Sequence, residues 1–337
     1  MDAQQEVIID ATAQAEIVHS LSRKLRACYI FPDIAEQITI GLKKHLEDGD
    51  YAGITEGEIF ALALTMHLQE IYHDEYLWVR WHPETLPDDE GPLRLNQAWQ
   101  EERQLEARLD NFGIHKLERL PGNVGSIDIH YFHRPAWGGD AAAAAMNYLI
   151  NTQAMIIDLR QCTGGFPGMV VLLCSYLFGE EPIHLISIYW RDEDITQQYW
   201  TLPYVPGKRL TDHPIFVLTS RLTFSGGEMF AYILQNHHRA TLIGEKTDGG
   251  AHAGASYRSH PHFEVFIPIG RCINPLTNSD WEGSGVTPDI SVPQEQAFKV
   301  AYRMALESIL ARLGESPSGL FRVLTEEAQE VLEGLVD

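Results

Sequence analysis

The chain has 337 residues, of which 45% are hydrophobic, enough to bury the core of one large domain or two ordinary ones. Its 47 acidic and 25 basic residues give a formal net charge of -22, which repels nucleic acid and anionic membrane surfaces. Nucleic acid is therefore not expected as a partner. The 4 cysteines are scattered with no CxxC pair, which indicates neither a disulfide framework nor a metal cluster.

The first residues carry neither a basic start nor a long apolar run, and no later stretch approaches the ~20 apolar residues that span a bilayer. The sequence therefore predicts no membrane span and a cytoplasmic location.

In the N-terminal part, apolar residues recur at helical spacing in three segments, 16–28, 34–46 and 58–72. They predict a small helical domain over residues 1–90. A polar, proline-bearing stretch then leads into a connector, 91–121, expected to be an exposed helix or irregular.

Beyond residue 121, predicted strands alternate with predicted helices, which favours an α/β layered fold over residues 122–297. The predicted strands are 124–132, 154–159, 215–219 and 241–244. The predicted helices between them are 140–151, 167–178 and 226–234. Residues 298–337 are expected to form an amphipathic helix followed by a loosely packed acidic tail.

Three segments place small or polar residues at strand-to-helix junctions, where open α/β sheets bind ligands: 157–165, 218–228 and 243–252. In the second segment, Ser225 precedes Gly-Gly-Glu, a pattern that fits a nucleophile but also a helix capping box. The chain has no GxSxG elbow, HExxH, P-loop or GxGxxG motif. From this pattern alone, both interpretations of Ser225 stay open.

The order and separation of the three segments resemble the carboxy-terminal-processing, or tail-specific, protease family. Residues 158–165 resemble its Asp-Leu-Arg-x-Asn-x-Gly-Gly signature, 223–228 its nucleophile segment and 244–247 the following loop. The resemblance continues through 281–283 and 285–289. It implies a ClpP/crotonase-like fold with Ser225 as the nucleophile of a serine peptidase.

A narrower resemblance links the chain to the branch that contains interphotoreceptor retinoid-binding protein and its bacterial relatives. It rests on Tyr-Ile-Phe-Pro-Asp at 29–33, on the predicted helix end at 68–74 and on Gly-Gly-Ala-His at 249–252. This extends the resemblance to nearly the whole chain.

The resemblance also implies an oxyanion hole for the attack by Ser225. Its donors would be the backbone N–H of Gly226 and one N–H from Gly164 or Gly165. Glycine suits these positions because a substrate must approach the backbone closely.

The sequence does not identify the base that would activate Ser225. Relatives use a lysine in the loop after the nucleophile helix, but Gly250 stands at that position, and Lys246 precedes it. A Ser-Lys dyad is therefore not expected.

A tricorn-like site would instead use a histidine and a glutamate, and Glu282 matches the glutamate. Relatives read His-Asp-x-His-Leu where this chain reads His-Asp-Glu-Tyr-Leu, so Tyr76 stands at the expected histidine position. His73 and His252 remain candidates for the base, and geometry must decide between them.

The sequence thus predicts a cofactor-independent serine peptidase, without a metal, that hydrolyses peptide or protein substrates by acyl transfer through Ser225. The alternative is a catalytically impaired relative that binds a peptide or an apolar retinoid-like or fatty-acid-like ligand. Substrate preference and oligomeric state do not follow from the sequence.

Overall fold

The structure is a computed structural model that describes residues 8–88, 91–93, 97–314 and 319–335. The described residues within 1–96, 188–197 and 252–273 form one compact unit. Those within 97–187, 198–251 and 274–337 form a second compact unit. The first unit thus includes two segments that the sequence alone assigned to the α/β core.

Three helices open the first unit: α1 (Ala11–Cys28), α2 (Pro32–Asp48) and α3 (Gly57–Ile71). Asp10 caps α1 by accepting a hydrogen bond from the Ala13 N–H at 2.8 Å. Gly49, with φ of 80°, ends α2 in the left-handed conformation that glycine tolerates best. The helices bury one apolar stripe each, as their sequence periodicity predicts. Side chains on these stripes include Leu21, Leu25, Ile38, Leu42, Phe60 and Leu64.

Strands complete this unit. The hairpin β9 (His252–His260) and β10 (Phe263–Ile273) is antiparallel, and β10 also pairs with β1 (Trp78–Trp81). The sheet runs in the order β1-β10-β5-β6, and the residues of β5 (His184–Trp190) and β6 (Ile195–Trp200) that lie within 188–197 belong to this unit. Phe263, Val265 and Ile267 of β10 belong to the same buried cluster as the helix stripes.

The second unit contains a six-stranded sheet in the order β11-β8-β7-β4-β3-β2. Its strands are β2 (Ile114–Leu120), β3 (Val124–Ile129), β4 (Ala154–Asp158), β7 (Ile215–Thr219), β8 (Thr241–Gly244) and β11 (Ile290–Ser291). All neighbours pair in parallel except β2, which pairs with β3 in the antiparallel direction. The carboxyl ends of β4, β7 and β8 therefore lie side by side at one edge of the sheet.

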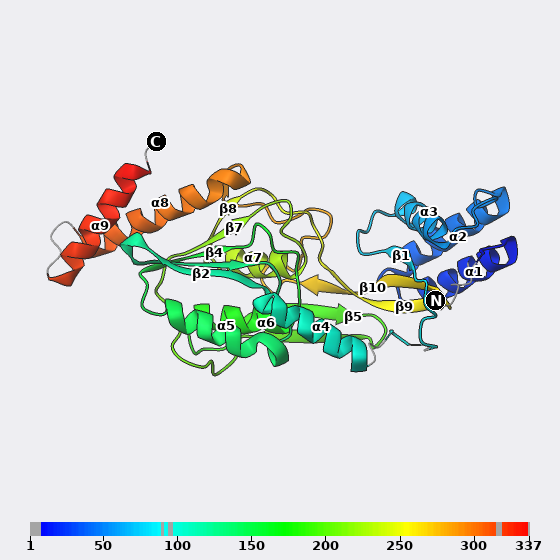
Figure 1. Cartoon of the computed structure of the whole chain (residues 1–337), viewed down its shortest axis with the longest axis horizontal. Helices are drawn as coiled ribbons and strands as arrows, with labels where there is room; N and C mark the ends of the chain where they lie inside the picture. The colour runs from blue at the N-terminus through cyan, green and yellow to red at the C-terminus, as the bar shows by residue number, and fades with distance from the viewer. Residues whose placement is uncertain (1–7, 89–90, 94–96, 315–318, 336–337) are drawn as a thin grey trace, which may run out of the picture. The chain divides into compact units, whose positions relative to one another are not determined.

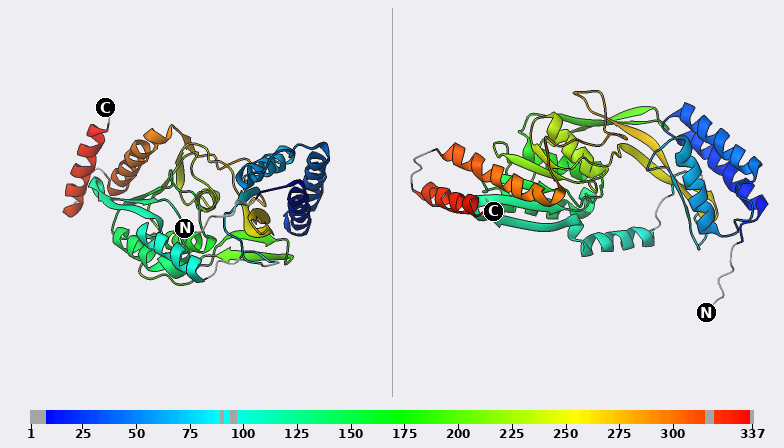
Figure 2. Two further views of the ribbon diagram at one scale, coloured as in Figure 1. Left: turned by 45° about the vertical axis from the view of Figure 1, so that its right-hand side comes forward. Right: turned by 90° about the horizontal axis from the view of Figure 1, so that it is seen from above.

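Helices cover both faces of this sheet (Figures 1 and 2). They are α5 (Pro135–Leu149), α6 (Pro167–Leu177), α7 (Gly226–Asn236) and α8 (Gln294–Leu313). Side chains alternate along β4, so that Ala154 and Ile156 face the cluster with α8, whereas Met155 and Ile157 face α5 and α6. The predicted α/β fold class is confirmed, because parallel strands joined by covering helices are what the alternating pattern implies.

The connector contains the helix α4 (Gln97–Leu109), one of the two forms expected for it, and then the edge strand β2, which the sequence did not predict. The expected loose tail contains α9 (Leu320–Gly334), which buries Ala328 against the α8 cluster because its apolar residues recur at helical spacing. Single-turn 3-10 helices span Asn111–Gly113 and Pro121–Asn123. None of the helices in the described part of the chain combines the length and the hydrophobicity that a membrane span requires.

Candidate active site

Ser225 lies at the junction between the turn after β7 and the first residue of α7. Its backbone has φ of 51° and ψ of -115°, a conformation that residues with a Cβ rarely adopt. Holding it there costs on the order of 1–3 kcal/mol, which the surrounding structure must supply. A half-buried serine on a strained strand-to-helix turn is the arrangement expected of a nucleophile whose hydroxyl is exposed to a substrate.

Hydrogen bonds fasten this turn to the segment after β4. Thr223 Oγ1 donates to the Leu159 carbonyl at 2.7 Å, and Ser220 Oγ donates to the Arg160 carbonyl at 2.6 Å. Arg160 in turn forms an ion pair with Asp158, Nη2 to Oδ2 at 2.6 Å, at the end of β4. The Asp-Leu-Arg motif therefore braces the backbone next to Ser225.

Gly164 and Gly165 bring their backbone directly against Ser225 and Gly226. Their φ angles are 120° and 131°, which favour glycine. A Cβ on Gly164 would lie 2.8 Å from Ser225 Cβ, and one on Gly226 would lie 2.9 Å from the Gly165 nitrogen. The N–H groups of Gly165 and Gly226 donate to no other described residue. Two available donors thus lie on touching segments beside the serine, as an oxyanion hole requires.

Glu228 is a buried carboxylate at the start of α7 whose structural role the sequence did not reveal beyond a capping box. It accepts hydrogen bonds from the N–H groups of Ser225, Gly249 and Gly250 at 2.8, 2.8 and 2.9 Å. The hydroxyl of Thr247 donates a fourth at 2.6 Å. Burial raises the pKa of Glu228 to about 7, and these four donors oppose the shift.

The loop at 247–251, which supplies three of the four donors to Glu228, is held from its other side by residues 281–286. Glu282 Oε2 accepts from the Ala251 N–H at 2.6 Å, and the buried Trp281 donates Nε1–H to the Gly250 carbonyl at 2.9 Å. Thr247 Oγ1 accepts from the Val286 N–H at 2.7 Å. Gly250, at the position of the relatives' lysine, therefore belongs to a rigid loop tied through Glu228 to the Ser225 backbone.

In the first unit, Asp74 and His252 form a buried pair. His252 Nδ1 lies 2.9 Å from Asp74 Oδ2, and their side chains are 2% and 0% exposed. Tyr29 donates its hydroxyl to the same carboxylate oxygen at 2.8 Å, and Asp74 Oδ1 accepts from the Tyr76 N–H at 3.0 Å. A carboxylate on Nδ1 fixes the ring and favours the tautomer with a lone pair on Nε2, as in Ser-His-Asp sites.

The other candidates for the base lie in different surroundings. His73 is 73% exposed, and its Nε2 is 3.8 Å from Glu75. Tyr76 is half-buried with its ring 6.0 Å from that of Phe266. The Glu75 carboxylate beside His73 is itself 44% exposed, whereas the Asp74 carboxylate beside His252 is fully buried.

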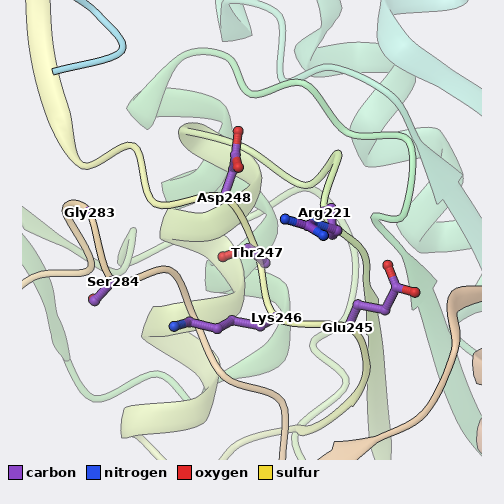
Figure 3. Close-up of a pocket in the computed structure, with 7 residues that line it drawn as sticks. All are labelled: Arg221, Glu245, Lys246, Thr247, Asp248, Gly283 and Ser284. Carbon is purple, nitrogen blue, oxygen red and sulfur yellow. The ribbon is translucent and has the colours of Figure 1, made fainter. Parts of the chain in front are cut away.

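Lys246 lines an open, polar pocket of about 440 Å³ (Figure 3). The pocket is lined by Arg221, Glu245, Lys246, Thr247, Asp248, Gly283 and Ser284. Charges of both signs are drawn around it, and Lys246 points toward Ser284. Lys246 therefore belongs to a surface pocket, whereas the hydroxyl of the next residue, Thr247, bonds to the buried carboxylate of Glu228.

Cys162 lies between the Asp-Leu-Arg motif and Gly164 and is buried. Burial raises the pKa of its thiol to about 12, so the reactive thiolate form is suppressed at neutral pH. Ser225, rather than this neighbouring thiol, is the nucleophile candidate of the site.

The core has a strained serine at a strand-to-helix junction, with glycine N–H donors beside it. This arrangement is characteristic of serine hydrolases. Comparison with known sequences specifies the family. Residues 123–292, half of the chain, match the family described as Peptidase family S41. The chain therefore belongs to peptidase family S41, which confirms the family predicted from its motifs. Residues 1–111 match the N-terminal domain of Peptidase_S41 in eukaryotic IRBP.

Two cyanobacterial proteins are similar in sequence. A carboxyl-terminal-processing protease of Synechocystis sp. is 28% identical over 175 residues, covering 52% of this chain and 39% of that protein. One from Picosynechococcus sp. is 35% identical over 141 residues, covering 42% of this chain and 32% of that protein. The matches thus span less than half the length of either relative.

Solved structures show the same fold. A putative peptidase from Parabacteroides merdae superposes with a TM-score of 0.57 at 16% identity, covering 96% of this chain and 97% of that one. A photosystem II D1 C-terminal processing protease gives a TM-score of 0.52 at 15% identity, covering 84% and 93%. These likenesses support the fold assignment.

Proposed function

We propose that the chain is a serine peptidase of the tail-specific protease family that hydrolyses peptide bonds through an acyl-enzyme on Ser225. The observation that carries the proposal is the strained Ser225 beside the available N–H groups of Gly165 and Gly226. Membership of family S41 supports the same reaction class.

In the proposed reaction, a base takes the Ser225 proton as Oγ attacks the scissile carbonyl carbon. The N–H groups of Gly165 and Gly226 stabilise the oxyanion. Gly164, which has no side chain, lets the substrate come close to the backbone beside Ser225. Collapse of the tetrahedral intermediate breaks the C–N bond, and the protonated base gives its proton to the leaving amine. Water then hydrolyses the ester by the same steps and restores Ser225.

We assign the base to His252. It is oriented by Asp74, and it directly follows Ala251 in the loop that Glu228 ties to the Ser225 N–H. The Glu75 side chain beside His73 is 44% exposed, so His73 lacks a buried carboxylate partner of this kind.

Glu282 has a positioning role in this proposal, because its carboxylate holds the Ala251 N–H next to His252. No cofactor takes part in the proposed steps. The reaction uses the chain's own base and backbone donors.

The proposed substrates are peptides or proteins, in keeping with the relatives named carboxyl-terminal-processing protease. Carriage of a retinoid-like or fatty-acid-like ligand is not favoured. The apolar cavity inside the sheet-and-helix core, lined by Ile127, Met146, Phe230 and neighbours, holds about 10 Å³. That is room for about one water, far below the several hundred Å³ of a ligand site. The cytoplasmic location stays a prediction.

The test is labelling of the full chain with a fluorophosphonate probe at neutral pH. Ser225→Ala is compared with Ser284→Ala, a matched variant at an exposed serine of the same unit. Labelling of the wild type and of Ser284→Ala, but not of Ser225→Ala, is expected. If the folded wild type does not react, or if Ser225→Ala reacts equally well, the peptidase proposal is wrong.

A further inference from the structure

A second cluster of chemically active side chains lies among the helices of the first unit, on residues separate from the proposed catalytic set. It consists of His45 in the last turn of α2 and of His67 and Glu70, three residues apart on α3. One ligand-type atom from each residue lies within 4.8 Å of the other two. Residues at i and i+3 share a helix face, which explains how α3 presents two of them together.

Both imidazole rings are held through Nδ1. His45 Nδ1 lies 2.6 Å from Asp50 Oδ2, and His67 Nδ1 lies 3.0 Å from the Tyr51 hydroxyl. When each Nδ1–H donates to its oxygen partner, the lone pair of each ring is on Nε2. Metal-binding histidines are typically oriented in this way, with the second nitrogen engaged by a carboxylate or another acceptor.

The two partners are themselves fixed by the turn after α2. The Asp50 N–H donates to the His45 carbonyl at 3.0 Å. Tyr51 is 1% exposed and packs edge-on against Phe60, with ring centroids 5.1 Å apart. Tyr51 therefore gives His67 a buried support, whereas the Asp50 side chain that holds His45 is 46% exposed and is placed by its own backbone in the turn.

From this arrangement, we propose that His45, His67 and Glu70 bind a zinc-class divalent cation that links α2 to α3. Two imidazoles and a carboxylate are a donor set typical of zinc, which completes four-coordination with a water. The overall charge of -22 favours cation binding. Histidine spacing in the sequence did not indicate this site, because its ligands come from two helices.

Metal binding requires a limited rearrangement. The rings are stacked, with centroids 3.7 Å apart and an interplanar angle of 9°, so they must tilt for both Nε2 lone pairs to meet one ion. Tetrahedral zinc brings its ligand atoms to about 3.4 Å from one another. Glu70 Oε2 already lies 3.7 Å from His45 Nε2, and its side chain is 67% exposed and can rotate.

The competing explanation is an ion-free network in which His45 contacts Asp50 and Glu70 through its two ring nitrogens. It predicts no zinc dependence of any property. The chain also offers a matched control cluster, His115, Asp128 and His130, whose rings are likewise stacked, at 4.4 Å and 9°.

The experiment titrates the tag-free, chelator-treated full chain with zinc chloride by calorimetry at pH 7.5 and follows thermal unfolding with and without zinc. We expect one zinc per chain and a rise in Tm. Glu70→Gln and His67→Gln should each weaken binding at least about tenfold, and Asp50→Asn, which keeps all three ligands, should weaken it about tenfold. His115→Gln should change neither stoichiometry nor affinity.

Because Glu70 is exposed, its substitution should leave the unfolding curve of the zinc-free protein unchanged, so loss of binding reports on the site. Absence of saturable one-to-one binding overturns the proposal. So does binding that survives both Glu70→Gln and His67→Gln, or binding that disappears in His115→Gln.

Discussion

Thr247→Val is the substitution that most directly probes the link between the buried carboxylate and the nucleophile. The Thr247 hydroxyl donates to Glu228 Oε1 at 2.6 Å and accepts from the Val286 N–H at 2.7 Å. Thr247 is 5% exposed, and valine has nearly the same shape. The substitution therefore removes two hydrogen bonds without opening a large cavity.

The expected cost follows from those two bonds. A lost hydrogen bond to a charged group and a buried N–H left without its acceptor each cost about 1–3 kcal/mol, so the free energy of unfolding should fall by about 3 kcal/mol. The Ser225 N–H shares the Glu228 carboxylate, so the rate of fluorophosphonate labelling should fall as well.

The pH dependence gives a second, independent expectation. Burial raises the pKa of Glu228 from 4.5 to about 7, so its contribution to stability is full below pH 4.5 and is lost as the pH rises to 7. The Thr247 hydroxyl lowers this pKa, so Thr247→Val should raise it further. The cost of the substitution should therefore be smaller at pH 5 and grow as the pH rises through 7.

The assay is urea unfolding of wild type and variant from pH 5 to 8, with probe labelling at each pH. Thr325→Val is the control, because its hydroxyl bonds to the Phe321 carbonyl on an exposed helix face. Thr325→Val should change the free energy of unfolding by no more than about 0.5 kcal/mol. A cost for Thr247→Val no larger than the control's, or one that shrinks with rising pH, would refute the role assigned to Glu228.

Three further substitutions test the rest of the site. Gly164→Ala places a Cβ 2.8 Å from Ser225 Cβ at a φ of 120°, so it should abolish labelling and lower the Tm; full labelling of this variant would contradict the close approach. Asp74→Asn should favour the wrong tautomer of His252 and reduce peptide turnover by on the order of 10⁴-fold, whereas His73→Gln should leave turnover within about twofold. Loss of turnover in His73→Gln instead would move the base to that residue.

The α/β core and the order of its elements could be predicted from the sequence, because buried parallel strands and their covering helices have distinct hydrophobic patterns. Strands 215–219 and 241–244 begin and end where they were predicted. The position of Ser225 at a strand-to-helix junction also followed from local pattern. These features depend on residues close together in the chain, and local propensity and periodicity report on them.

The sequence did not predict the strands at 184–200 and 252–273. Their residues mix apolar and polar side chains without a clean alternation, and β10 is defined by its pairing with β1, more than 180 residues away. Strand formation of this kind depends on the partner as much as on the segment itself.

The hydrogen-bond partners of the polar groups became visible only in the folded structure. The sequence pattern indicated a helix-capping role for Glu228, but Glu228 also accepts hydrogen bonds from a loop about twenty residues later. The partner of His252 Nδ1 is Asp74, which is 178 residues away. A buried charge must find its hydrogen-bond partners wherever the fold supplies them. Long-range partners leave no periodic signal in the sequence, so the fold could be predicted from pattern, whereas the proposal of His252 as the base rests on contacts in the packed structure.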